Sequence, residues 1–246
     1  QHISLYAHTK RIDFATSVDW HENRRMLKAA FPVDVRTTKA RFDIQFGNIE
    51  RPTHWNTSWD LAKFEVAAHK WADISENGFG LALMNDCKYG HDAKGNTLRI
   101  TLLKSPKFPD PNADMGDHEF TYSIMSHGGD FRTAEVEKQA AWLNDRLLVA
   151  SGEVEDLRRI VACDNENIYI DAVKRAEHGE KVIVRFHEFF GKTSRVKLTS
   201  DFTIASWCET DLMEQPVSPE SFSAVDLAVK PYEIKTIALD IHSEAE

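Results

Sequence analysis

Arg11–Trp20 reads RIDFATSVDW, and apolar and polar residues alternate along it. In an extended strand, successive side chains point to opposite sides, so every second residue lies on the same face. The sequence therefore predicts a β-strand that packs one face on a core and turns the other to water. The predicted core face consists of Ile12, Phe14, Thr16, Val18 and Trp20.

The same period of two recurs along most of the chain. Turn-forming pairs such as Asn77-Gly78 and Gly128-Gly129 separate many of the alternating runs. Short alternating strands with such turns between them are typical of an antiparallel sandwich, so we expect an all-β fold. The other runs are Phe42–Phe46, Leu98–Leu102, Phe120–Ile124, Val182–Phe186, Val196–Leu198, Phe202–Ile204 and Ile237–Ile241.

The clearest helical pattern lies in Thr133–Leu148, where one stripe of the predicted helix carries Val136, Ala140, Leu143 and Leu147. After this stretch, Ser151–Leu157 is rich in Ser, Gly and Glu, and the strands beyond it are shorter. We therefore expect a large β unit over residues 1–150 and a smaller β unit over residues 151–246.

Composition narrows the classes of partner. The 246 residues include 30 Lys and Arg against 39 Asp and Glu, a net charge of −9, which argues against binding nucleic acid or anionic membranes through bulk charge. No apolar run approaches the ~18–20 residues of a membrane span. The chain begins at Gln1 rather than Met, so we expect it to be part of a longer polypeptide. Three widely spaced cysteines favour a reducing, cytoplasmic compartment: Cys87, Cys163 and Cys208.

One loop, Asp110–Glu119, gathers oxygen ligands and begins like a calcium loop. Its glycine stands at the seventh place and its glutamate at the tenth, where the calcium motif requires the sixth and the twelfth. An Asp-rich connection that caps its own backbone is the better interpretation. The motifs of known hydrolase nucleophiles and of phosphate-binding loops do not occur in the sequence.

Two other stretches are polar or aromatic enough to suggest a ligand site. Asn85–Gly90 follows the apolar run Leu81–Met84 and mixes amide, carboxylate, ammonium and phenol groups, which suit sugar hydroxyls. From spacing alone, an ordinary surface turn is the more frequent explanation. Trp55 and Trp59 either form an aromatic platform for a sugar ring or anchor the core, and the sequence leaves both roles open.

Longer segments are more specific than these short patterns. Phe46–His54 (FGNIERPTH), Leu81–Gly90 (LALMNDCKYG) and Asp117–Tyr122 (DHEFTY) resemble the C-terminal half of glycoside hydrolase family 38 α-mannosidases, in particular the cytosolic, vacuolar and bacterial branch. The resemblance covers nearly the whole chain. The other similar segments are Val18–Asn23, Asn56–Asp60, Phe64–Val66, His69–Trp71, Leu102–Pro106, Val184–Glu188 with Gly191, and Glu209–Glu214.

The resemblance implies a galactose-mutarotase-like antiparallel β-supersandwich followed by a smaller β-sandwich. It also implies a longer enzyme that cleaves terminal α-mannose with retention, a reaction that needs two carboxyl groups. A divalent ion, zinc or cobalt, assists in that family. The family's nucleophile and metal ligands lie in segments without a counterpart here, so the resemblance assigns no catalytic or metal residue to this chain. The implied partners are an α-mannoside or oligosaccharide substrate and the polypeptide's own N-terminal catalytic domain.

The resemblance also changes the interpretation of the polar turn. In the family, a loop at the matching strand end approaches the sugar, so the residues expected to line the cleft are Asn85, Asp86, Lys88 and Tyr89. We expect the chain alone to be inactive. Two alternatives remain open, namely a stand-alone carbohydrate-binding β module and a purely structural or interaction domain.

Overall fold

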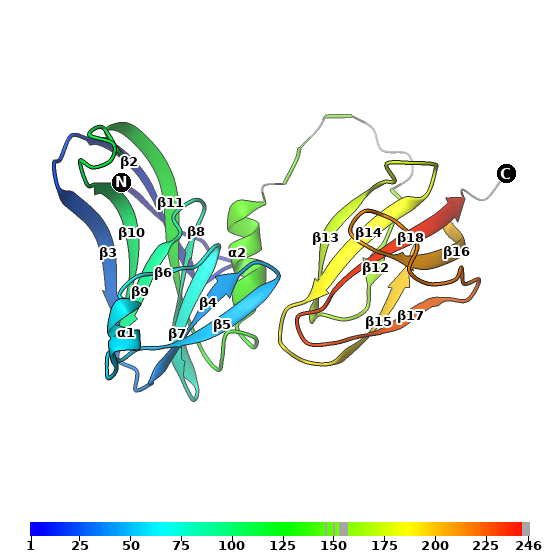
Figure 1. The fold of residues 1–246 in the computed structure, drawn as a ribbon, viewed down its shortest axis with the longest axis horizontal. Helices are drawn as coiled ribbons and strands as arrows, with labels where there is room; N and C mark the ends of the chain where they lie inside the picture. Colours follow the sequence, from blue (N-terminus) through cyan, green and yellow to red (C-terminus); the bar gives the residue numbers. More distant parts are fainter. Residues whose placement is uncertain (146, 150, 153–156, 243–246) are drawn as a thin grey trace. The chain divides into compact units, whose positions relative to one another are not determined.

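The computed structural model describes residues 1–145, 147–149, 151–152 and 157–242. They form two compact units, Gln1–Leu148 and Val149–Glu246 (Figure 1). Every strand pairing that the structure describes is antiparallel. The predicted all-β antiparallel fold is therefore confirmed.

The first unit contains two sheets. The larger has the strand order β1-β2-β11-β8-β7-β4-β5, and the smaller has the order β3-β10-β9-β6. The bounds in the larger sheet are β1 His2–Leu5, β2 Arg11–Trp20, β4 Lys39–Ile44, β5 Gly47–Pro52, β7 Trp71–Glu76, β8 Phe79–Asn85 and β11 Gly116–His127. The bounds in the smaller sheet are β3 Arg25–Pro32, β6 Val66–Ala67, β9 Gly90–Lys94 and β10 Thr97–Ser105.

The core of this unit lies between the two sheets. Phe42, Ile74 and Leu83 from the larger sheet belong to one buried cluster with Leu98 and Ile100 from β10. Phe14, Val18 and Trp20 pack against the cluster, as the alternation in β2 predicts.

The water-facing side of β2 departs from the prediction at Asp13, which is buried. Its carboxylate accepts hydrogen bonds from Arg11 Nε at 2.7 Å and from Ser123 Oγ at 2.7 Å. This face of β2 therefore carries a buried polar cluster where the alternation predicts solvent.

Helix α2, Val136–Asn144, packs against β7 and β8. Trp71 of β7 is fully buried there, stacked on Phe131, and its Nε1 donates to Glu137 Oε2 at 2.6 Å. Neither described helix has the length and apolar character needed to cross a bilayer. The second helix, α1, is the short segment Ser58–Ala62.

The predicted helix Thr133–Leu148 is wrong at both ends. The Asp130 carboxylate accepts the backbone N–H groups of Arg132 and Thr133, which forms a separate turn before the helix. Glu135 then adopts a left-handed conformation with φ of 52°, so regular helix begins only after it. Beyond the other end, the last apolar residue of the predicted stripe, Leu147, is 93% exposed.

The second unit is a smaller sandwich of two sheets. Val184, Phe186 and Ile237 from one sheet form a buried cluster with Val196 and Leu227 from the other. One sheet has the order β12-β15-β17, with bounds Ala162–Cys163, Ser194–Thr199 and Val225–Val229. The other has the order β13-β14-β18-β16, with bounds Ile168–Arg175, Val182–Glu188, Ile234–His242 and Thr203–Thr210.

Candidate functional site

The predicted substrate loop begins at Asn85, the last residue of β8, and ends where β9 starts at Gly90. The Asn85 side chain is buried and its amide is used within the fold. Its Nδ2 donates to the His69 carbonyl at 2.8 Å, and its Oδ1 accepts from the Lys88 backbone N–H at 2.6 Å. Asn85 therefore fixes the shape of the turn.

Asp86 ties the same turn to β11. Its backbone N–H donates to the Thr121 carbonyl at 3.1 Å, and its Oδ2 accepts from the Thr121 N–H at 2.9 Å. Its other oxygen, Oδ1, is buried and has no hydrogen-bond partner among the described residues. Asp86 also lines a cavity of about 460 Å³ together with Ser17 and Glu119. A buried carboxylate oxygen without a donor costs free energy, so this turn carries an unsatisfied acceptor next to a cavity-lining residue.

Cys87, next to Asp86, is not a nucleophile in this setting. Partial burial and the charge of the neighbouring Asp86 carboxylate raise the pKa of the Cys87 thiol to about 11. Because the thiolate is the reactive form, this thiol is inert at neutral pH.

Lys88 and Tyr89 carry the outward-facing polar groups of the turn. Lys88 Nζ lies 4.6 Å from the centre of the Phe120 ring, on the β11 side where Asp86 contacts Thr121. The Tyr89 ring is exposed and lies 5.2 Å from the His69 ring. The structure thus brings Asp86 and Lys88 to β11 and places Tyr89 beside His69.

The two tryptophans lie in different surroundings. One face of the Trp55 ring is covered by Lys94 Nζ, which lies 3.6 Å from its centre. Trp59 is 78% exposed on α1, so a core-anchor role is wrong for it. The α1 segment exists because Thr57 and Asp60 cap each other: Thr57 Oγ1 accepts from the Asp60 N–H, and Asp60 Oδ2 accepts from the Thr57 N–H.

The Asp-rich loop caps backbone groups. Asp110 Oδ1 accepts from the Asn112 N–H at 2.8 Å, and Asp114 Oδ2 accepts from the Lys104 N–H at 2.7 Å. Within the described part of the chain, no three His, Cys, Asp or Glu side chains gather as metal ligands. These residues therefore do not fit the zinc or cobalt ion that the resemblance implies, and no step through a metal follows from them.

Sequence analysis missed a second cavity, of about 470 Å³, beside α2. Arg11 from β2 and Gln139 and Trp142 from α2 line it, although about 130 positions separate the two segments. A local pattern cannot join residues so far apart. The one feature of the sequence that could have indicated this cavity is Trp142, a large aromatic residue that lies outside the apolar stripe of the predicted helix.

Comparison with known proteins connects both units to one family. Residues 1–112 match the family described as "Glycosyl hydrolases family 38 C-terminal domain". Residues 167–237 match the "Glycosyl hydrolases family 38 C-terminal beta sandwich domain".

Curated relatives are similar over nearly the whole chain. Alpha-mannosidase G from Dictyostelium discoideum is 40% identical over 247 residues, which cover 96% of this chain and 23% of the relative. Alpha-mannosidase 2C1 from Homo sapiens is 39% identical, with 93% of this chain and 23% of the relative covered. Alpha-mannosidase from Saccharomyces cerevisiae is 32% identical, with 95% and 24% covered. The chain thus spans about a quarter of the length of these relatives.

A solved structure has the same fold. The crystal structure of a glycosyl hydrolase family 38 protein from Enterococcus faecalis superposes with a TM-score of 0.80 at 18% identity. The superposition covers 97% of this chain and 29% of that one. At this level of identity the similarity shows a shared fold and nothing finer.

Proposed function

We propose, from the premise that this chain is built from the C-terminal domains of glycosyl hydrolase family 38, that it forms the C-terminal β part of an α-mannosidase. The full polypeptide would hydrolyse terminal α-mannosides with retention. The observation that carries the proposal is the similarity to proteins named alpha-mannosidase over more than nine-tenths of this chain, at 32–40% identity.

We place the reacting groups elsewhere in that polypeptide. A retaining mechanism needs a nucleophilic carboxylate and an acid/base carboxyl group about 5–5.5 Å apart. In the family that this chain resembles, these groups and the divalent ion, zinc or cobalt, belong to an N-terminal domain. The β domains would then support that domain and close one side of its cleft.

The turn after β8 is the proposed contribution of this chain to the cleft wall. The buried, unpartnered Oδ1 of Asp86 and the adjoining cavity support a role in accepting a hydrogen bond from a sugar hydroxyl. Lys88 would supply a donor and Tyr89 a phenol at the surface, while Asn85 would hold the backbone of the turn in place. The three free thiols support a reducing, cytoplasmic setting.

An activity assay tests the proposal. We expect an aryl α-mannoside to be hydrolysed by the full polypeptide and not by residues 1–246 alone, with or without added zinc or cobalt. Turnover by residues 1–246 alone would contradict the proposed division of roles. A folded full polypeptide that left the aryl α-mannoside intact with both metals present would contradict the proposed activity.

A further inference from the structure

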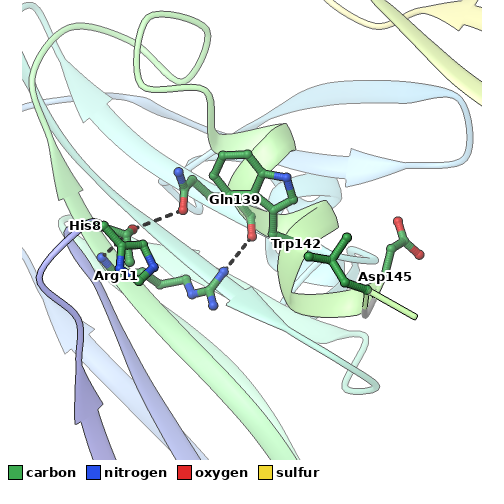
Figure 2. A pocket seen from close by; sticks show the side chains of 7 residues that line it. His8, Arg11, Gln139, Trp142 and Asp145 are labelled. Atoms are coloured by element: carbon green, nitrogen blue, oxygen red, sulfur yellow. Dashed lines mark hydrogen bonds between the residues drawn. The ribbon is translucent and has the colours of Figure 1, made fainter. Parts of the chain in front are cut away.

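The cavity beside α2 is built from two distant parts of the first unit (Figure 2). Gln139 and Trp142 stand three positions apart on α2 and therefore lie on one face of the helix. The Trp142 side chain is largely exposed. A volume of about 470 Å³ lies in the ~300–1,000 Å³ range of small-molecule sites. The lining consists of His8, Thr9, Arg11, Gln139, Trp142, Asp145 and Leu147.

Hydrogen bonds hold the floor of this cavity, and its positive charge is compensated. The guanidinium of Arg11 donates through Nε and Nη2 to both oxygens of Asp13, at 2.7 and 3.2 Å. Its Nη1 donates to the backbone carbonyl of Gln139 at 2.9 Å, as Figure 2 shows. Because Asp13 neutralises Arg11 at contact distance, the cavity has no strong attraction for a phosphate or carboxylate. With Arg11 compensated and the Asp145 carboxylate also in the lining, the site favours a neutral ligand over an anion.

The walls combine an aromatic face with hydrogen-bonding groups. Gln139 Oε1 accepts from Thr9 Oγ1 at 3.1 Å, which orients the amide and leaves Gln139 Nε2 without a protein partner among the described residues. His8 adds an exposed imidazole. A purely apolar ligand would leave these polar groups unpaired, which costs free energy. A ligand that offers hydroxyls on its edge and C–H groups on its face satisfies both kinds of wall.

We propose that this cavity is a saccharide-binding site, in which one pyranose ring stacks on Trp142 and its hydroxyls bond to Gln139 and His8. The volume leaves room for a mono- or disaccharide. The preference for a saccharide comes from the cavity itself. The choice of a mannoside as the first probe rests on the proposed function.

The test is ligand-observed NMR with residues 1–246 and two probes, methyl α-mannoside and methyl α-glucoside. We expect saturation transfer to at least one of them, with dissociation in the millimolar range or tighter. Trp142→Ala should weaken binding at least tenfold, and Trp142→Phe should retain part of it. Because Trp142 is exposed, both variants should keep the thermal unfolding temperature of the parent chain.

The matched control is Trp59→Ala, which removes a tryptophan that is 78% exposed, against 62% for Trp142, and that lies outside this cavity. It should leave binding unchanged. The proposal is overturned by the absence of transfer to both probes at 50 mM (about the practical upper limit), by binding that survives in Trp142→Ala, or by equal loss in Trp59→Ala. This readout needs no hydrolysis, so its failure is distinguishable from failure of the proposed mannosidase activity.

Discussion

His91 should make the first unit sensitive to mild acid. The side chain lies on β9 and is completely buried, and neither ring nitrogen has a hydrogen-bond partner among the described residues. Burial lowers the pKa of the imidazole from an ordinary value of 6.5 to about 4. The folded state therefore holds His91 neutral, whereas the unfolded chain protonates it below about pH 6.5.

The sign and the magnitude follow from proton linkage. Between pH 6.5 and 4 the unfolded state binds more protons than the folded state, so the free energy of unfolding falls as the pH falls. The pKa of His91 is 6.5 in the unfolded state and about 4 in the folded state. Acidification from pH 7.5 to 5.0 should therefore lower the free energy of unfolding by about 2 kcal/mol through this group.

The variant His91→Leu removes the titration and fills a similar volume with apolar atoms. Urea unfolding at pH 7.5 and 5.0 is followed by tryptophan fluorescence. Between these two pH values, the free energy of unfolding should fall by about 2 kcal/mol less in the variant than in the parent chain. Five of the six tryptophans lie in the first unit, at positions 20, 55, 59, 71 and 142, so fluorescence mainly reports that unit. At pH 7.5 the variant should be at least as stable as the parent, because two unpartnered buried nitrogens are gone.

The control is His2→Leu, the same change at an exposed histidine of the first unit. In this variant, the free energy of unfolding should differ between pH 7.5 and 5.0 by the same amount as in the parent chain. Equal pH dependence in His91→Leu and the parent would refute the argument that the buried imidazole stays neutral. A variant much less stable than the parent at pH 7.5 would show that the nitrogens have partners after all.

Two further predictions concern a buried carboxyl group and a glycine. Burial and the nearby Glu137 raise the pKa of Asp43 to about 8, so the folded state binds the extra proton and stability falls as the pH rises from about 4 to 8. Asp43→Asn should reduce the stability lost between pH 6 and 8.5 by about 2–3 kcal/mol in urea unfolding, and an unchanged loss would exclude a neutral Asp43. Gly191→Ala should destabilise the second unit more than Gly179→Ala by about 1–3 kcal/mol in calorimetry. Both glycines have positive φ, but only at Gly191 would a new Cβ meet the Tyr232 hydroxyl, at 2.6 Å. Equal losses of stability in the two glycine variants would mean that the Tyr232 side chain moves away from the new Cβ at no cost.

The sequence predicts the positions of strands better than it predicts which of their side chains are buried by other segments. The alternation in Arg11–Trp20 gives β2 with the same bounds, because a period of two is a local property. It misses the burial of Asp13, which depends on Arg11 and on Ser123 in a strand more than a hundred residues away. Helix α1 escaped prediction because none of its residues is buried, so no apolar stripe marks it.

The same limit applies to the candidate site. The run of polar residues after β8 indicates the position of the turn, and the structure places a turn there. Sequence could not tell that Asn85 turns inward to His69 while Tyr89 stays exposed. Those directions are set by contacts with segments before β7 and in β11. The roles of Asp86, Lys88 and Tyr89 toward a sugar stay predictions.

Asn144, the last residue of α2, donates from Nδ2 to the backbone carbonyl of Asn85 at 3.0 Å. The helix therefore holds the end of β8 in place through a side-chain hydrogen bond to its backbone. Redesign of the turn after β8 has to preserve this hydrogen bond, because a change of register in α2 would carry the Asn85 carbonyl with it. Any redesign of this turn therefore has to consider residues 136–144 as well, even though some 50 residues of chain separate the helix from the turn.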